Sequence, residues 1–187
     1  MNNLTGIILA GGKSSRMGKD KGLVKYAGKA MIEYSLEICR QLCNEILIST
    51  ANSDYAVYGY PLIEDEIQDI GPIGGIYASL KSAGNPKAIV LSCDTPFLKK
   101  ELLELLVEKI NEADMVVPYT GEQKMEPLCA CYSKTLLSLM KEQIAEKDYK
   151  LHNLIDKAHS IKIKIDKRYE FYTENLFNNL NNPKDLI

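Results

Sequence analysis

The chain has 187 residues, of which 45% are hydrophobic and 26% are charged. This length supports one domain with a sizeable core and leaves too little for two enzyme domains. The 23 Lys and Arg residues nearly balance the 25 Asp and Glu residues, so the net charge of -2 excludes a general attraction to nucleic acid or to an anionic membrane surface. Any site for an anion must therefore be local.

The apolar runs in the chain have the length of strands. The run from Gly6 to Ala10 is typical, and none approaches the roughly 20 apolar residues that a membrane-spanning helix needs. The N-terminus, Met1 to Thr5, lacks the basic region, the apolar region and the cleavage site of a secretory signal. We therefore expect a cytoplasmic protein that has neither nucleic acid nor a membrane among its partners.

Strand-like runs alternate with helical patterns along most of the chain. Apolar residues at helical spacing predict helices over 31–42, 73–83, 101–111 and 133–145. Strands are predicted over 5–10, 45–49, 60–63, 88–92 and 115–118, around Cys129 and Cys131, and at the sheet edge over 161–165. This order is typical of βαβ units and predicts a single α/β domain over residues 1–187 with a mainly parallel, twisted sheet.

The five cysteines and two histidines are the residues that would suggest disulfides or a zinc site. Three observations argue against a disulfide framework: the number of cysteines is odd, no CxxC pair occurs, and the chain has enough apolar residues to build a core without disulfides. We interpret them as small buried hydrophobic residues in a reducing compartment, and we do not expect zinc.

The segment that follows the first predicted strand carries the richest chemistry in the sequence. It reads LAGGKSSRMGKDKG, with four glycines that let backbone N–H groups approach an anion and with the cations Lys13, Arg16, Lys19 and Lys21. A glycine-rich turn with a solvated charge cluster is the alternative. We favour a phosphate site, because a loop after the first strand lies at the carboxyl end of the sheet, where open α/β folds bind ligands.

Two common phosphate motifs do not match this loop. A P-loop requires GxxxxGK[ST], whereas five residues separate Gly12 from Gly18 and Asp20 follows Lys19. The dinucleotide fingerprint GxGxxG is also absent. The loop therefore indicates a phosphate site of another kind.

A lone carboxylate, Asp94, follows the buried strand-like run in the sequence VLSCDTPF. Magnesium prefers oxygen ligands and takes one or two protein carboxylates, with phosphates and waters completing its shell. An Asp before Thr95-Pro96 is also suited to cap a turn. The residue pattern by itself leaves both roles open.

The first loop resembles a known family signature. LAGGKSSRMGKDKGL is similar to the motif LAGGxSxRMGxDK of the molybdenum cofactor guanylyltransferases, which belong to a wider group of nucleotidyltransferases with a Rossmann-like sheet. The resemblance implies a three-layer α/β/α fold of the nucleotide-diphospho-sugar transferase type. The sequence LAGG, with Gly11 and Gly12, resembles the form of this motif in the guanine-selective branch of the family. The related cytidylyltransferase carries LAAG at the same place.

Further stretches resemble the same family. CDTPF matches its CDxP segment, which implies that Asp94 binds magnesium and nucleotide phosphate. Ile63-Glu64-Asp65, followed by the stretch from Gly71 to Ile76, resembles its ED and GPLxG motifs, which implies that Asp65 lies near the guanosine. Thr50 and Asn52 stand where some relatives read NAN, and which of the two contacts the base stays open.

The acceptor side is implied by two later stretches. Glu126-Pro127-Leu128 resembles a segment that borders the acceptor site, and FNNLNNPKDL is similar to the family's FxNxNTPxDL. Asn179 and Asn181 occupy the two Asn positions of that motif, which implies contact with the pterin side. Asn-rich turn chemistry is the alternative for these residues.

Taken together, the resemblance implies transfer of GMP from GTP to molybdenum-molybdopterin, with release of pyrophosphate and with Mg2+ as cofactor. The implied catalytic residues are Arg16, Lys21 and Asp94, with Asp94 also the metal ligand. The implied nucleotide-binding residues are Leu9, Ala10, Gly11, Gly12, Lys21, Asp65 and Asp94.

Two other functions remain open at this point. In the first alternative, the chain is a cytidylyltransferase, or another nucleotidyltransferase that acts on a pterin or sugar phosphate. In the second alternative, the chain is a nucleotide-binding adaptor that delivers the cofactor without turnover. Molybdoenzymes or their chaperones are the partners that would receive the product.

Overall fold

The computed structural model describes residues 3–11 and 20–180, and within them a mixed sheet forms the centre of the molecule. Its strands follow the order β10-β7-β9-β6-β1-β4-β5, and β8 pairs with β7. Their bounds are β1 Thr5–Leu9, β4 Glu45–Ser49, β5 Leu62–Ile63, β6 Lys87–Ser92, β7 Met115–Thr120, β8 Lys124–Met125, β9 Cys129–Ser133 and β10 Ser160–Lys164. A separate small hairpin joins β2 (Lys25–Tyr26) to β3 (Lys29–Ala30).

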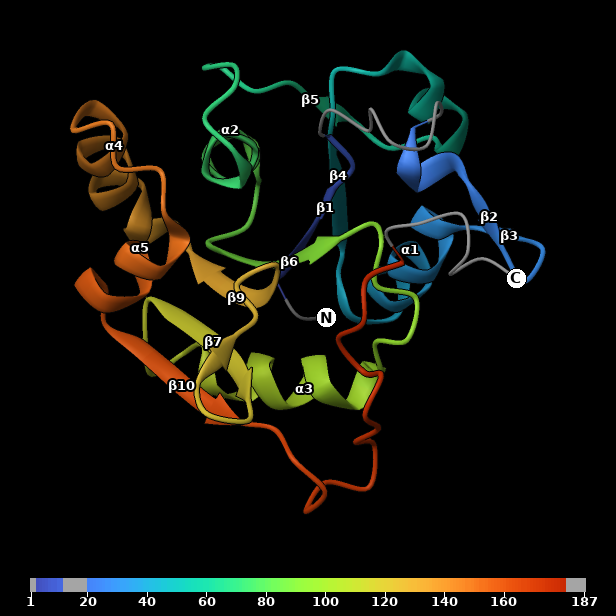
Figure 1. Cartoon of the computed structure of the whole chain (residues 1–187). Coiled ribbons are helices and arrows are strands. Elements are labelled where there is room, and N and C mark those ends of the chain that lie inside the picture. The colour runs from blue at the N-terminus through green and yellow to red at the C-terminus, as the bar shows by residue number, and fades with distance from the viewer. Residues whose placement is uncertain (1–2, 12–19, 181–187) are drawn as a thin grey trace.

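Helices cover both faces of this sheet, as Figure 1 shows, with α2, α4 and α5 on one side and α1 and α3 on the other. The α-helices are α1 Met31–Leu42, α2 Pro72–Ser82, α3 Lys100–Lys109, α4 Leu137–Ala145 and α5 Leu151–Lys157. Three short 3-10 turns complete the described elements: η1 Lys21–Leu23, η2 Ser53–Tyr58 and η3 Lys134–Leu136. The expected three-layer α/β/α architecture is confirmed.

The period of the strands explains why two separate cores form. In β1, Ile8 packs into the core on the α1 and α3 side, whereas its neighbour Ile7 packs into the core under α2 and α4. In β6, Leu91 and Val90 divide between the two cores in the same way. Strands buried on both faces are typical of parallel sheets covered by helices.

The sheet is mostly parallel, as predicted. β1 lies between β4 and β6 and is parallel to both, with Ile7 opposite Leu47 on one side and Val90 on the other. The pairs β4 with β5 and β7 with β10 are also parallel. β9 departs from the pattern, because it runs antiparallel between β6 and β7.

Several element boundaries differ from the prediction for local reasons. Ser133 caps the 3-10 turn η3 through its hydroxyl, so α4 begins only at Leu137. The hairpin β2–β3 and helix α5 have too few residues to produce a periodic signal. β10 lies at the sheet edge, as expected from its one-sided pattern. None of the helices within 3–11 and 20–180 is long and apolar enough to cross a membrane.

The cysteines are free thiols, and all except Cys43 are buried, as the sequence indicated. Cys39, on α1, and Cys43, which caps the end of that helix, cover β1 at Gly6. A Cβ atom at Gly6 would lie 2.7 Å from the sulfur of Cys39 and 3.3 Å from that of Cys43. The close approach of α1 to β1 therefore requires glycine at this position.

We predict that Gly6→Ala lowers the free energy of unfolding by about 1 to 3 kcal/mol, because the methyl group overpacks the contact with α1. Urea denaturation of the purified protein measures this change. Gly11→Ala is the matched control, since among the described residues a Cβ there would meet only the Ser49 carbonyl, at 3.7 Å. Equal stabilities for the two variants would contradict the packing argument.

Candidate active site

The candidate site lies where β1, β4 and β6 end. Because these strands are parallel, their carboxyl ends meet at one edge of the sheet. Backbone hydrogen bonds join the segments beyond them: Ala10 N–H donates to the Ser49 carbonyl (3.0 Å), and Cys93 N–H donates to the Leu9 carbonyl (3.1 Å). Residues far apart in the sequence are thereby held next to one another.

An ion pair between Lys21 and Asp94 occupies this edge. The Lys21 ammonium comes from η1, and the Asp94 carboxylate follows β6 by two residues. The two side chains are only 18% and 11% exposed, and the Ser92 hydroxyl donates to the other carboxylate oxygen of Asp94. Partial burial weakens screening by water and salt, so this pair acts as a fixed pair of charges.

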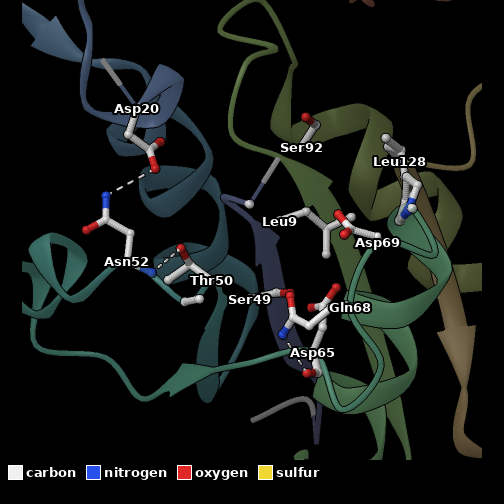
Figure 2. A pocket seen from close by; sticks show the side chains of 15 residues that line it. Leu9, Asp20, Ser49, Thr50, Asn52, Asp65, Gln68, Asp69, Ser92 and Leu128 are labelled. Atoms are coloured by element: carbon white, nitrogen blue, oxygen red, sulfur yellow. Dashed lines mark hydrogen bonds between the residues drawn. The ribbon is translucent and has the colours of Figure 1, made fainter. Parts of the chain in front are cut away.

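A cavity of about 620 Å³ opens at this edge of the sheet (Figure 2), and its lining includes Ser92, which donates to Asp94 of the ion pair. Its wall comes from the ends of β1, β4 and β6, from the segment before α2 and from the first turn of that helix. The lining residues are Leu9, Gly11, Asp20, Ser49, Thr50, Ala51, Asn52, Asp65, Gln68, Asp69, Gly71, Pro72, Gly75, Ser92 and Leu128. Its volume is in the range of sites that hold a small organic ligand.

Asp65 lies half-buried in the wall, packed on the start of α2. Cβ atoms built on Gly74 and Gly75 would each lie 3.1 Å from one of its carboxylate oxygens, so the two glycines make room for the side chain. Burial raises the pKa of the Asp65 carboxyl above its ordinary value. An ionised acceptor that has lost part of its hydration favours a ligand that offers N–H donors.

The start of α2 is built for this close packing. Pro72 occupies its first turn, where the missing N–H costs no helical bond, and Gly71 before it adopts a positive φ of 75°. The motif that the sequence singled out here therefore has a direct structural role beside Asp65.

Asp94 is suited to a divalent cation. Within 3–11 and 20–180, no group of three or more His, Cys, Asp and Glu side chains could hold a metal by itself. Magnesium needs no such group, because it binds through one or two carboxylates and completes its shell with phosphates and water. The oxygen donors at Asp94 fit such an ion.

The structure brings together the predicted site residues that it describes in the N-terminal half. Leu9, Gly11 and Asp65 line the cavity, and Lys21 and Asp94 form the ion pair beside it. The Ala10 N–H donates to the Ser49 carbonyl, and the part of Ala10 in the backbone cradle stays a prediction. Predicted residues Gly12, Arg16 and Asn181 lie outside the described residues, as do Lys13 and Lys19.

On the acceptor side, Asn179 is exposed and precedes Leu180, whose N–H donates to the Asp94 carbonyl (3.1 Å). Leu128 of the EPL stretch lines the cavity, and its carbonyl accepts from the Ser92 N–H (2.9 Å). Both stretches therefore lie against the segment that carries Asp94.

Sequence reasoning missed Asp20 and Tyr55. Asp20 lines the cavity and accepts hydrogen bonds from the Asn52 amide and the Tyr55 hydroxyl. The other end of the Asn52 amide accepts from Asp54 N–H, so both ends of this side chain are engaged within the protein. Asp20 stood inside the loop motif, which was the available signal, whereas nothing in the pattern around Tyr55 marked it.

The fold and the site together define the class of protein to which this chain belongs. A cavity at the carboxyl edge of parallel strands, with a lysine and an aspartate paired beside it, is typical of α/β proteins that bind nucleotides.

Comparison with known proteins narrows this class. The model of the MobA-like NTP transferase domain matches residues 6–161. A probable molybdenum cofactor guanylyltransferase of Flavobacterium johnsoniae is 35% identical over 176 residues, which cover 94% of this chain and 93% of that protein. The chain belongs to the MobA-like NTP transferases, the family of the molybdenum cofactor guanylyltransferases, and is thus a nucleotidyltransferase.

Solved structures agree with this result. Molybdopterin-guanine dinucleotide biosynthesis protein A from Archaeoglobus fulgidus has a TM-score of 0.81 and 27% identity, over 97% of this chain and 94% of that one. A more distant structure of the same fold, Rv0371c from Mycobacterium tuberculosis, was solved in complex with manganese (TM-score 0.63, 14% identity, 87% and 88% coverage). The resemblance seen in the first loop is confirmed.

The half-buried Asp65 carboxyl gives a prediction about stability. Its raised pKa means that the folded state holds this proton more tightly than the unfolded state, so Asp65 adds stability at low pH that is lost as the pH rises through its folded pKa. We expect ligand-free Asp65→Asn to melt at a higher temperature than the wild type at pH 7, because the amide carries no charge.

Thermal denaturation between pH 4 and pH 8 checks this prediction, with Asp156→Asn as the control at an exposed carboxylate in a surface ion pair. The gap between Asp65→Asn and the wild type should close as the pH falls. A gap that is independent of pH would show that another effect of the substitution dominates.

Proposed function

We propose that this chain transfers GMP from GTP to the terminal phosphate of molybdenum-molybdopterin and releases pyrophosphate. The observation that carries the proposal is the Lys21–Asp94 pair, which Ser92 links to a cavity of nucleotide size with a half-buried carboxylate, Asp65, in its wall. Full-length relatives named molybdenum cofactor guanylyltransferase support the same activity.

The reaction requires alignment and neutralisation of charge rather than a protein nucleophile. The acceptor phosphate is already anionic, so it attacks the α-phosphorus without a general base, while the bond from that phosphorus to pyrophosphate breaks. In our proposal, Lys21 and Arg16 stabilise the negative charge that develops on the departing pyrophosphate. The absence of His from the cavity lining within the described residues is consistent with this chemistry.

Asp94 would hold Mg2+, which supplies charge neutralisation at the phosphate oxygens. Ser92 donates to one Asp94 oxygen and Lys21 contacts the other, so the two partners hold the carboxylate in a fixed orientation. Gly11, at the cavity wall, would let the backbone approach the phosphates, together with Gly12.

Guanine is the base that suits Asp65. Its N1–H and N2–H groups are neighbouring donors, and an ionised carboxylate can accept from both. Cytosine presents only one such group, its amino N4, and would leave part of the buried acceptor unsatisfied. We therefore propose that Asp65 selects GTP, which agrees with the Gly11-Gly12 form of the loop.

The acceptor would bind on the side of Asn179 and Asn181, since the neighbouring Leu180 N–H is tied to the residue that holds the metal. We further propose that the enzyme works in the cytoplasm, because its five cysteines are free thiols. Molybdoenzymes or their chaperones would receive its product.

We predict that the purified protein releases pyrophosphate from GTP when magnesium and molybdenum-molybdopterin are both present, and that CTP and ATP react at least about tenfold more slowly. A coupled pyrophosphate assay measures all three nucleotides. Faster turnover with CTP would favour a cytidylyltransferase, and nucleotide binding without pyrophosphate release would favour an adaptor. Either result would contradict the proposal.

We predict that Asp94→Asn lowers kcat by roughly 100-fold or more, because the isosteric amide removes the charge that would hold the metal. The same pyrophosphate assay, repeated over a range of magnesium concentrations, measures the effect. Asp156→Asn serves again as the control at an exposed carboxylate. Wild-type turnover by Asp94→Asn would exclude Asp94 as the metal ligand.

A further inference from the structure

The Asp20 carboxylate joins two distant parts of the chain just before Lys21. It accepts hydrogen bonds from the Gly22 N–H (3.2 Å), from the Asn52 side-chain amide (3.1 Å) and from the Tyr55 hydroxyl. Figure 2 shows Asp20 and Asn52 facing each other across the cavity wall. Asn52 and Tyr55 belong to the segment after β4, so Asp20 fastens the segment of Lys21 to that part of the fold.

Tyr55 is a rigid anchor for this contact. Its side chain is fully buried, and burial raises the pKa of its phenol far above the ordinary value, so the hydroxyl stays protonated and donates to Asp20. The bond to an ionised acceptor is of the stronger, charge-assisted kind. The Tyr55 hydroxyl therefore sets the position of the Asp20 carboxylate.

The backbone at Gly22 is packed closely against Tyr55 and Cys93, which restricts the movement of the segment that carries Lys21. A Cβ atom there would collide with the Tyr55 hydroxyl and would lie 3.2 Å from the Cys93 sulfur. The backbone around Lys21 is thus packed between Tyr55 on one side and the residue that precedes Asp94 on the other. The side-chain bond from Asp20 to Gly22 N–H also caps η1, the turn that carries Lys21.

The position of the Lys21 backbone matters because its side chain is long and flexible. A lysine ammonium on a four-carbon stem is a mobile point charge unless its base is fixed. Fixed charges stabilise a reaction better than charges that must first be ordered. The hydrogen bonds of Asp20 fix the backbone at the base of the Lys21 side chain, independently of the contact between Lys21 and Asp94.

We propose that Asp20 is a positioning residue: held by Tyr55 and Asn52, it fixes the backbone of Lys21 so that the ammonium meets Asp94 and the phosphates of the nucleotide. This inference rests on the proposed function for the role of Lys21. It differs from a role of Asp20 as a second metal ligand, in which the Tyr55 hydroxyl would have no part.

A double-mutant cycle tests the proposal. Tyr55→Phe removes one hydroxyl and keeps the buried ring, and we expect kcat/KM for GTP to fall about tenfold, the lower end for loss of a hydrogen bond to a charged group. In a Lys21→Met background, which keeps the stem and removes the charge, the same substitution should change kcat/KM less than about twofold. Equal factors in both backgrounds would overturn the proposal.

Tyr58→Phe is the matched control, because Tyr58 belongs to the same turn η2 and has no hydrogen bond to Asp20. We expect wild-type kcat/KM for this variant. Melting temperatures of all variants establish that each is folded. Asp20→Asn gives a second route, since its amide loses the acceptor that faces either Asn52 or Tyr55, and it should show the same dependence on Lys21.

Failure of the proposal and failure of the proposed function give different results. If the wild type releases no pyrophosphate from GTP, the proposed function fails, and the same cycle is then read on the affinity for magnesium–GTP by calorimetry. Coupling of Tyr55 to Lys21 in that affinity supports the positioning role. A wild-type value for Tyr55→Phe, in turnover or in affinity, overturns it.

Discussion

The contact between Lys21 and Asp94 is the interaction on which the rest of the site depends. It joins the first loop to the end of β6, and it keeps a positive charge beside a carboxylate in a place that water reaches poorly. The pairing is possible because β1 and β6 are parallel neighbours, so the segments that follow them leave the sheet at the same edge. A change in strand order would separate the two charges.

The charge around this pair explains how a slightly acidic protein can bind a polyanion. Asp20, Asp65 and Asp69 line the cavity, so its described wall is acidic and does not attract phosphate by itself. In the proposed reaction, the cations of the first loop supply that attraction, and Asp94 contributes through a bound cation. The proposed function therefore places the base against this acidic wall, where carboxylates meet its N–H donors, and the phosphates beside the cations.

The sequence predicted those parts of the molecule that depend on local pattern. β4 has the predicted bounds because its apolar run is continuous, and Asp94 follows β6 as expected from the buried strand before it. The direction of β9 and the network of Asp20 with Tyr55 were not predictable, because both depend on which segments meet in space. Asn52 illustrates the limit: its place in a motif pointed to the base, whereas the fold uses its amide for Asp20 and for the cap of η2.

The hydrogen bond from Leu180 N–H to the Asp94 carbonyl has a consequence for the order in which the protein folds. Asp94 follows β6 in the middle of the sheet, whereas Leu180 lies far along the chain, beyond β10. Contacts between such distant segments form late, because closing a long loop costs entropy that local contacts do not. This contact therefore forms late in folding, after the local contacts within each element.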